Sequence, residues 1–426
     1  MEQKVSEQSS MQQNGKDTKV KGRNMVVVVL FLGWMFACLD RSVLSIALIP
    51  IQKEFGINEA ATGIILSAFF LGFLLIQLPA GMLADKFGSR NVLLVAVIAW
   101  AVFTALTGLA WGMVSLIVVR FIFGFFDGFF PSASSKSIAS NFPVKQRARA
   151  KTIVLMGSGF GGILSAIVRA GMVQSFGWRS AFYVLAGIGL IIFLLFWFGL
   201  KDKKQEDNAS AGQKPAANKV PLKVLAKTPL IWSLGITSLA IQFVNWGVQT
   251  WMPIYLVKTH NLDLMQMGEL IALSGIVMIL AALLIGYILD KVTGYEKYTA
   301  IFGAAGAAIF LVLLATATNP VLAVIYQTLA QIGCAFVTFT TLTNPLKRFA
   351  VETVGTANGM INTLGQIGAF LSPMIMGFMI QATGSYTAGF MVLAGFVLVA
   401  AIAGGTIPII KGLNNAKKSK GASAAT

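Results

Sequence analysis

The sequence predicts an all-α membrane protein whose twelve transmembrane helices form two pseudo-symmetric halves of six. Of the 426 residues, 56% are hydrophobic and 12% are charged, and the mean hydropathy is +0.77. A single soluble core cannot bury that much apolar surface. Hydrophobic runs of about 20 residues, the length that crosses a bilayer, recur along the chain. A short pattern also occurs twice, 205 residues apart, which indicates a duplicated half.

Twelve hydrophobic spans follow one another in chain order, six on each side of a polar stretch. Each is expected to be a helix, because a lipid-facing backbone must satisfy its own hydrogen bonds. The first six lie near residues 24–46, 61–82, 89–109, 112–136, 149–172 and 178–200. The second six lie near residues 229–257, 264–289, 298–316, 319–340, 353–379 and 385–410.

Polar segments flank and separate the two halves, 24–200 and 229–410. Residues 1–23 lack the apolar run of a signal peptide and are expected to form a disordered cytoplasmic tail. Residues 201–228 are charged and rich in Ala, Asn and Lys, which predicts a cytoplasmic linker. Residues 411–426 are expected to form a second cytoplasmic tail.

The lysines and arginines gather on one side of the membrane when the loops are assigned alternately to its two sides. That side receives 27 of the 33, and the other receives only Lys53, Arg179 and Lys258. Because basic loops stay in the cytoplasm, both termini are expected in the cytoplasm. The protein itself is expected to span the plasma (bacterial inner) membrane. The formal charge of +17 follows mostly from this topology. No basic–aromatic pattern indicates a nucleic-acid partner.

Residues suited to metal binding or covalent chemistry are scarce. Cys38 and Cys334 lie inside predicted spans, and His260 is the only histidine. These counts exclude a disulfide framework, a Cys-type zinc site and a His-based triad. The glycine-rich segment 157–162 lacks the Lys-Ser/Thr ending of a phosphate-binding loop. We therefore expect no enzymatic activity and no cofactor, and we expect the protein to act as a monomer in the lipid bilayer.

The repeated pattern follows the second and the eighth span. It reads Gly-Met-Leu-Ala-Asp-Lys-Phe-Gly-Ser-Arg at 81–90 and Gly-Tyr-Ile-Leu-Asp-Lys-Val-Thr-Gly at 286–294. It resembles the signature loop of the major facilitator superfamily, and the resemblance implies the major facilitator fold over residues 23–411. Gly81 is expected to permit close helix packing. Asp85 is expected either to cap a neighbouring helix or to act in a conformational latch formed by Gly81, Asp85, Lys86, Gly88 and Arg90.

Five ionisable residues lie well inside the spans of the first half. A charge at membrane depth is costly, so it persists mainly where it lines a cavity or has a partner. Desolvation raises the pKa of a carboxylate and a nearby guanidinium lowers it, so an acid in such a cavity can act as a proton switch. Arginine stays charged and presents a planar fork that matches an anion. The five residues are Asp40, Arg41, Arg120, Asp127 and Arg169.

Arg120 and Asp127 are seven residues apart, so they share one helix face at about 10.5 Å along the axis. Their segment reads Arg-Phe-Ile-Phe-Gly-Phe-Phe-Asp-Gly-Phe-Phe-Pro at 120–131, and residues 39–47 read Leu-Asp-Arg-Ser-Val-Leu-Ser-Ile-Ala. Both segments are similar to motifs of the anion:cation symporter family, whose relatives include organic-anion and sialic-acid transporters. The resemblance implies that Asp40 and Asp127 take up protons. It also implies that Arg41 binds the substrate and that Arg120 couples proton to substrate.

An alternative interpretation of the same residues stays open. Pairs between Asp40 and Arg120, and between Arg41 and Asp127, would then be static salt bridges that hold spans 1 and 4 together. Buried ion pairs stabilise a fold less than apolar packing does, which counts against a purely structural role.

The chain departs from the family pattern at three positions. Sugar-acid symporters of the family usually carry two tyrosines and a glutamine where this chain has Cys38, Phe73 and Ser158. Fewer hydrogen-bond partners then remain for a polyol in the first half. We expect a substrate with fewer hydroxyls than a hexonate, and Ser158 remains a candidate substrate ligand.

The second half contributes polar side chains without charge. Gln242, Asn245 and Gln249 share one face of span 7, just before a Trp-Met-Pro-Ile-Tyr-Leu segment at 251–256 that is similar to these symporters. Such stripes often make interhelical hydrogen bonds. Asn362 and Gln366 in span 11 match family positions that face the central cavity. We expect these five residues to contact the substrate, with Thr340, Thr341, Thr343 and Asn344 of span 10 as further candidates.

Arg169 lies eight residues before Gly177 and matches no family motif. It could bind a second acidic group of the substrate or form an outer gate. It could also extend along the helix to the membrane interface, as long basic side chains do.

These observations favour a proton-coupled symporter that imports a small organic anion by alternating access, with protons as the coupling ion. One alternative is an organic anion exchanger, which is disfavoured because span 7 has no arginine. Another is a membrane ligand sensor that does not transport, which is disfavoured because no signalling domain is attached. Span 5 also lacks the Gly-Pro motif of drug/proton antiporters.

Overall fold

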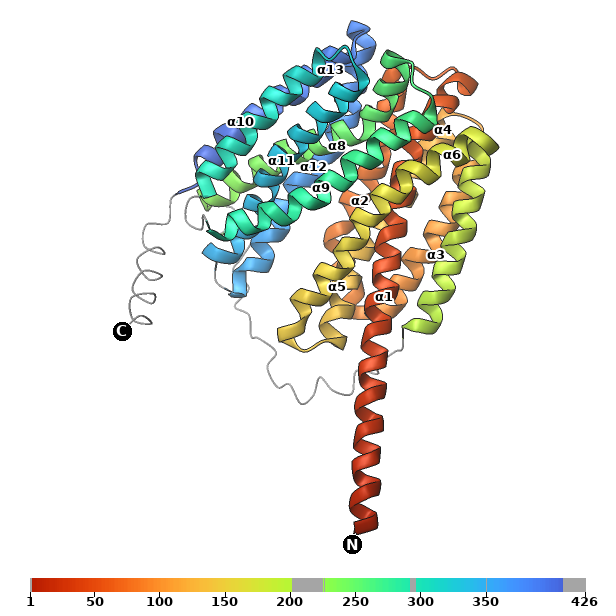
Figure 1. Ribbon diagram of the computed structural model, residues 1–426, viewed down its shortest axis with the longest axis vertical. Helices are drawn as coiled ribbons and strands as arrows, with labels where there is room; N and C mark the ends of the chain where they lie inside the picture. Colours follow the sequence, from red (N-terminus) through yellow and green to blue (C-terminus); the bar gives the residue numbers. More distant parts are fainter. Residues whose placement is uncertain (1, 201–224, 226, 292–295, 350, 409–426) are drawn as a thin grey trace.

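The computed structural model describes residues 2–200, 225, 227–291, 296–349 and 351–408. Long helices dominate this part of the chain and lie side by side in two groups (Figure 1). The first group comprises α1 (Glu2–Phe55), α2 (Glu59–Phe87), α3 (Ser89–Gly108), α4 (Met113–Asp127), α5 (Phe129–Asn141) and α6 (Val144–Gly199). The second comprises α8 (Pro229–His260), α9 (Leu264–Lys291), α10 (Glu296–Ala315), α11 (Pro320–Arg348), α12 (Val351–Thr383) and α13 (Tyr386–Gly405).

Two features relate these helices to the predicted spans. α4 and α5 together form one candidate span, Met113–Asn141, interrupted only at Gly128. α6 combines two helices, because the chain turns at Gly177, whose φ of 78° is readily adopted only by glycine. Among the described residues, eleven helical segments are long and apolar enough to cross a membrane. The first part of α6, which holds the predicted span 149–172, supplies the twelfth helix of the fold.

The segments outside the predicted halves have different outcomes. α1 begins at Glu2, so residues 2–22 are helical where the sequence predicts a disordered tail. This stretch contains four Gln and four Lys, which favour helix, and it continues the helix of the first span. Of the predicted linker 201–228, only residues 225, 227 and 228 are described, and the predicted tail 411–426 lies outside the described residues.

Helix packing defines the two halves and the seam between them. In the first half α1 and α3 pack against α6, and α2 packs against α4. In the second half α8 packs against α12, and α10 packs against α11 and α13. The seam is formed by α2 against α12 and by α6 against α9. Some of these approaches need glycine, since a Cβ atom at Gly124 of α4 would lie 2.0 Å from the Phe69 carbonyl oxygen of α2.

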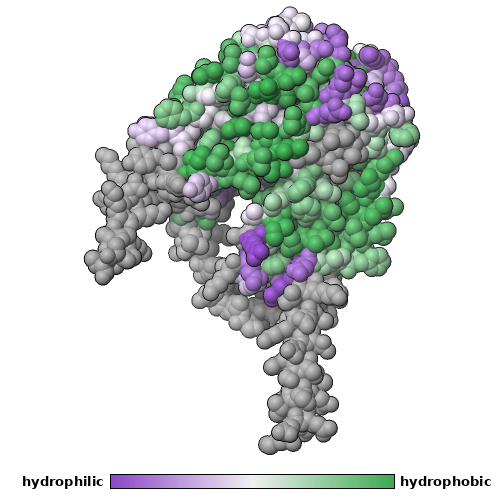
Figure 2. Space-filling model, in the orientation of Figure 1, coloured by the Kyte–Doolittle hydropathy of each residue, from purple (hydrophilic) through white to green (hydrophobic). Residues whose placement is uncertain are grey.

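The outer surface of the helix bundle is strongly apolar. Figure 2 shows hydrophobic residues over broad areas of both halves. On α9, for example, the side chains of Leu280, Leu283 and Leu284 are all exposed. Exposed apolar surface on this scale suits contact with lipid acyl chains.

The two halves are tied together at the end of the bundle opposite the projecting start of α1 (Figure 1). There Lys258 Nζ of α8 forms an ion pair with Glu59 Oε1 of α2 at 2.5 Å. The Glu59 backbone N–H donates to Gln381 Oε1 of α12 at 3.2 Å, and the Tyr386 hydroxyl of α13 lies 3.5 Å from Glu59 Oε1. We call these four residues the Glu59 cluster. Towards the other end the halves diverge, and Figure 2 shows a hollow between them.

Candidate substrate and proton site

Asp40 forms one of two buried charge pairs between α1 and α4. Its side chain is fully buried, and its Oδ1 accepts a hydrogen bond of 2.7 Å from Thr104 Oγ1 of α3. Its Oδ2 accepts one of 3.2 Å from Arg120 Nη1 of α4. The Arg120 guanidinium lies over the rings of Phe123 and Phe182, 5.1 and 5.2 Å from their centroids. Asp40 and Arg120 are therefore held in an apolar interior with hydrogen-bond and cation–π partners.

Arg41 forms the second pair with Asp127, the last residue of α4. The pair joins Arg41 Nη2 to Asp127 Oδ2. The Asp127 side chain is fully buried, whereas that of Arg41 is 15% exposed. The Arg41 guanidinium lies 5.1 and 5.4 Å from the ring centroids of Phe69 and Phe73. Phe73, at a position where the resemblance implies a tyrosine, contacts the arginine through its ring.

The two pairs are those that the static interpretation describes, but their arginines have unused donors. Arg41 Nε, Arg120 Nε and Arg120 Nη2 are buried and have no hydrogen-bond partner among the described residues. Buried donors of this kind are normally paired. The cluster can therefore supply donors to an additional anion, and Arg41 is its most exposed member.

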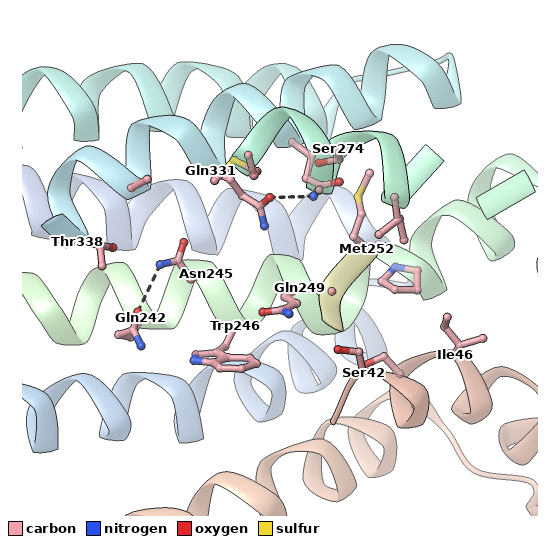
Figure 3. A pocket seen from close by; sticks show the side chains of 18 of the residues that line it. Ser42, Ile46, Gln242, Asn245, Trp246, Gln249, Met252, Ser274, Gln331 and Thr338 are labelled. Atoms are coloured by element: carbon pink, nitrogen blue, oxygen red, sulfur yellow. Dashed lines mark hydrogen bonds between the residues drawn. The ribbon is translucent and has the colours of Figure 1, made fainter. Parts of the chain in front are cut away.

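A cavity of about 440 Å³ lies between the halves and is lined mainly by α1, α8, α9 and α11 (Figure 3). We call it the central chamber. Gln242, Asn245 and Gln249 of α8 line it, and Asn245 Nδ2 donates to Gln242 Oε1 at 3.4 Å. The structure thus brings together the three span-7 residues that the sequence selects. The volume of the central chamber lies in the range of about 300–1,000 Å³ that is usual for small-molecule sites.

A smaller space of about 30 Å³ lies between the central chamber and the charge pairs. Arg41 and Arg120 line it, and four of its lining residues, Ser42, Ser45, Trp246 and Gln249, also line the central chamber. Trp246 of α8 packs edge-on against Phe70 of α2, with ring centroids 4.7 Å apart. The arginines and the amide side chains of α8 therefore border two adjoining spaces.

Several lining residues of the central chamber were not selected from the sequence. Gln327 and Gln331 of α11, Ser274 of α9 and Trp246 of α8 all face it. The two glutamines are four residues apart in an apolar span, which is the same signal that selected the polar stripe of span 7. The sequence therefore held a sign of this polar face, but periodicity alone does not say which stripe faces a cavity.

Other candidates lie elsewhere. On α12, Asn362 is exposed and Gln366 is half-buried, and neither lines the central chamber. On α11, the Thr340 hydroxyl lies 3.0 Å from that of Thr299, and Asn344 accepts from Arg348 Nε at 2.7 Å. These residues were expected to contact the substrate, but they do not line the central chamber. The same holds for Thr341 and Thr343, which bond to the backbone of their own helix.

Two candidates on α6 have side chains outside the described residues, Ser158 and Arg169. Their helix nevertheless borders the site. A Cβ atom at Gly161 would lie 2.5 Å from the Met35 carbonyl oxygen of α1, and Gly162 lines the central chamber.

The contacts found for the predicted latch residues Asp85, Lys86 and Arg90 all lie within the first half. Asp85 forms an ion pair of 2.8 Å with Lys136 of α5, and Arg90 donates to the carbonyl oxygens of Leu200 and Trp197 at 2.6 and 3.0 Å. Lys86 lies over the ring of Phe87. Gly88 joins α2 to α3 with a φ of 81°, which favours glycine.

The packing role predicted for Gly81 is wrong. Among the described residues, no atom would lie within 4 Å of a Cβ atom at this position, so none of the described neighbouring helices requires glycine there. Arg90, by contrast, bonds to the C-terminal carbonyl groups of α6 and so holds α3 against the end of that helix.

The twelve-helix arrangement, the apolar exterior and a buried site between two halves define a membrane transporter. The profile of the Major Facilitator Superfamily matches residues 30–373, and the chain belongs to this family. The predicted fold class and the resemblance are thereby confirmed, and the protein is a transporter and not an enzyme.

Three relatives carry names of organic-acid transporters. A probable sulfoacetate transporter of Cupriavidus necator is 29% identical over 90% of this chain and 94% of its own length. The hexuronate transporter of Bacillus subtilis is 26% identical, with coverage of 90% and 94%. A probable galactarate/D-glucarate transporter of Escherichia coli is 25% identical, with coverage of 91% and 95%. The names of these relatives suggest that the substrates are small anions.

Solved structures confirm the fold. A bacterial homologue of the human lysosomal transporter Spinster, in an inward-facing and unoccupied conformation, superposes with a TM-score of 0.79 at 19% identity, covering 90% of this chain and 96% of that one. A D-xylose–proton symporter gives a TM-score of 0.76 at 16% identity, with coverage of 91% and 98%.

Proposed function

We propose that the protein is a proton-coupled symporter that imports a small organic anion by alternating access. The observation that carries this proposal is the ion pair between Arg41 and Asp127. The most exposed cation of the buried cluster is paired with a fully buried carboxylate beside a cavity between the halves. One proton on that carboxylate removes the partner of the arginine.

In the proposed cycle, a proton from outside binds Asp127 and neutralises it. Arg41 then exchanges its internal partner for the acidic group of the substrate. Substrate binding and protonation of Asp127 are thereby linked, because a buried guanidinium without an anion is strongly unfavourable. The same linkage in reverse returns the proton once the substrate has left on the cytoplasmic side.

Asp40 and Arg120 have a supporting role in this proposal. Asp40 is a second site for a proton, and Arg120 responds to its charge through their 3.2 Å hydrogen bond. The amide side chains of α8 would contact the uncharged part of the substrate. Alternating access moves the two halves about this site.

The remaining parts of the proposal concern the setting of the protein. We place it as a monomer in a bacterial inner membrane with both termini in the cytoplasm, because most lysines and arginines are assigned to the side of the termini. Protons are the coupling ion and no other cofactor is required. The names of the relatives support a small organic acid as the substrate.

The test separates coupling from binding. A thermal-shift screen of organic acids first identifies a ligand, because a molecule that binds the native state raises its melting temperature. In proteoliposomes, Asp127→Asn mimics the protonated acid, so we expect it to keep substrate binding and counterflow exchange. We expect it to lose uptake driven by an inward proton gradient.

The matched control is Asp263→Asn, which makes the same change at an exposed acid before α9 and should leave uptake unchanged. If Asp127→Asn accumulates substrate as wild type does, Asp127 is not the coupling residue. If wild type exchanges anions but never responds to a proton gradient, the protein is an exchanger.

A further inference from the structure

We propose that Gln327 and Gln331 of α11 form a subsite that binds hydroxyl groups on the uncharged part of the substrate. The inference rests on the proposed function, because it takes Arg41 as the site of the acidic group. It assigns the central chamber to hydroxylated organic acids. This differs from the expectation of a poorly hydroxylated substrate, which was drawn from residues of the first half alone.

The first observation is an unused acceptor in the chamber wall. Gln327 is 5% exposed and lines the central chamber. Its Nε2 donates to Gln331 Oε1 at 3.2 Å. Its Oε1 is buried and has no hydrogen-bond partner among the described residues. Because buried polar atoms are nearly always paired, we expect this oxygen to accept a hydrogen bond from a molecule in the chamber.

The second observation is the orientation of Gln331. Its Oε1 accepts from Gln327, so its amide nitrogen is the end left for other partners. Figure 3 shows this nitrogen directed into the chamber, towards the side of Asn245. The pair thus offers an acceptor on Gln327 and a donor on Gln331. A hydroxyl group matches this combination, because it donates one hydrogen bond and accepts others.

The third observation is that the wall beside the glutamines is fixed. The hydroxyl groups of Ser274 on α9 and Thr328 on α11 lie 2.7 Å apart, and Thr328 donates to the Val324 carbonyl oxygen. Thr328 must therefore accept from Ser274, which leaves the Ser274 oxygen as a further acceptor facing the chamber. The bond also holds α9 and α11 in register at the subsite.

The subsite and the charge cluster can be reached by one molecule. The small space beside Arg41 and the central chamber share Ser42, Ser45, Trp246 and Gln249 as lining residues. An acid bound at Arg41 would therefore extend past Trp246 into the chamber. The names of the relatives do not show whether the substrate carries hydroxyl groups, because hexuronate and galactarate carry them and sulfoacetate does not.

The experiment compares acids that differ only in hydroxyl groups. Calorimetry on the purified full-length protein would measure the Kd of galactarate against adipate, and of gluconate against hexanoate. Each pair has the same chain length and charge. We expect the hydroxylated member of at least one pair to bind about tenfold more tightly or better, since each hydrogen bond contributes a few-fold.

The variants locate the effect. Gln327→Leu and Gln331→Leu should each reduce the preference for the hydroxylated acid a few-fold. The double variant removes both partners of one hydrogen bond, a change that proteins tolerate well. It should stay folded, bind adipate or hexanoate as wild type does, and lose the preference. Gln174→Leu, the same change at an exposed position of α6, should retain the preference.

The outcomes distinguish this inference from the proposed function. Equal binding of both members of each pair, or no binding of any of the four acids, overturns the hydroxyl subsite. A preference that survives the double variant places the subsite elsewhere. In each of these cases the coupling role of Asp127 is still judged separately, by proton-driven uptake of whichever acid the thermal-shift screen identifies.

Discussion

The charge cluster shows how single residues depend on one another inside a membrane. Asp40 and Arg41 are adjacent in sequence, yet they pair with different residues of α4 because adjacent side chains leave a helix in different directions. Arg120 and Asp127 lie two turns apart on one face and receive one partner each. The spacing therefore creates two separate pairs. Both arginines border the small space that leads to the central chamber, but only Arg41 is partly exposed.

Arg41→Lys tests the binding role at this scale. Lysine keeps the charge and can still pair with Asp127, but it lacks the planar fork that binds an acid through two hydrogen bonds. We expect substrate binding to weaken about 10- to 100-fold, the effect of losing a hydrogen bond between charged groups. Isothermal calorimetry with the acid found by thermal shift would measure it.

Arg179→Lys is the control for that substitution. Arg179 pairs with Glu54 at the exposed end of the first half, at 2.6 Å, away from the charge cluster. Its replacement should leave the Kd unchanged. An unaltered Kd in Arg41→Lys as well would move the anion site away from Arg41.

At the scale of elements, the Glu59 cluster joins both halves across their seam. Glu59 lies in the first turn of α2 and contacts residues of α8, α12 and α13. Each of these contacts must break if the halves separate at this end. The cluster therefore favours the arrangement in which this end is closed.

Lys258→Gln should shift the population of conformations towards opening at this end. An exposed ion pair contributes up to about 1 kcal/mol, which corresponds to a shift of up to roughly fivefold. In a background with Cys38→Ala and Cys334→Ala, Ser45→Cys in the chamber wall reports opening. We expect a membrane-impermeant maleimide added from outside to label it faster in the Lys258→Gln variant.

Two further variants check the cause of that change. Exchange of the charges, Glu59→Lys with Lys258→Glu, should restore slow labelling. Glu54→Gln removes an ion pair at the same end but within one half, so it should have no effect. Faster labelling in the Glu54→Gln variant would mean that the loss of any charge at this end speeds labelling, whether or not that charge joins the two halves.

Close helix approaches make a second prediction about elements. A Cβ atom at Gly124 would lie 2.0 Å from a backbone oxygen of α2, which cannot move without moving the helix. Gly124→Ala should therefore lower the melting temperature, with an overpacking cost of about 1–3 kcal/mol. Gly81→Ala meets open space within a helix, so it should leave the melting temperature unchanged or raise it. A scan of detergent-purified protein would show whether the two glycines differ in this way.

For the whole molecule, the positions of the basic residues predict its orientation in the membrane. Ser140 lies at the end of α5, near the lysines and arginines assigned to the cytoplasm, and Ser175 lies just before the turn at Gly177. Both side chains are exposed. In intact cells, an impermeant maleimide should label Ser175→Cys but should label Ser140→Cys only after permeabilisation. The opposite pattern would invert the proposed topology and the direction of import.

The sequence by itself determined the architecture of this transporter. Span length, hydropathy and the placement of basic residues are local properties, because the bilayer acts on each helix separately. The two halves followed from the repeat at 81–90 and 286–294, and the charge cluster followed from ionisable residues inside apolar spans. The motifs around Asp40 and Asp127 were sufficient to indicate an organic-anion transporter, as the relatives then supported.

Only the tertiary structure decided which side chains meet. Gln242, Asn362 and Gln327 give the same signal in sequence, yet two of them line the central chamber and Asn362 does not. Gly124 and Gly81 are both helical glycines, but only Gly124 faces another backbone. The rotation of each helix is set by packing against its neighbours across the whole bundle. Since lipid is apolar on every side of a helix, hydropathy alone leaves that rotation open.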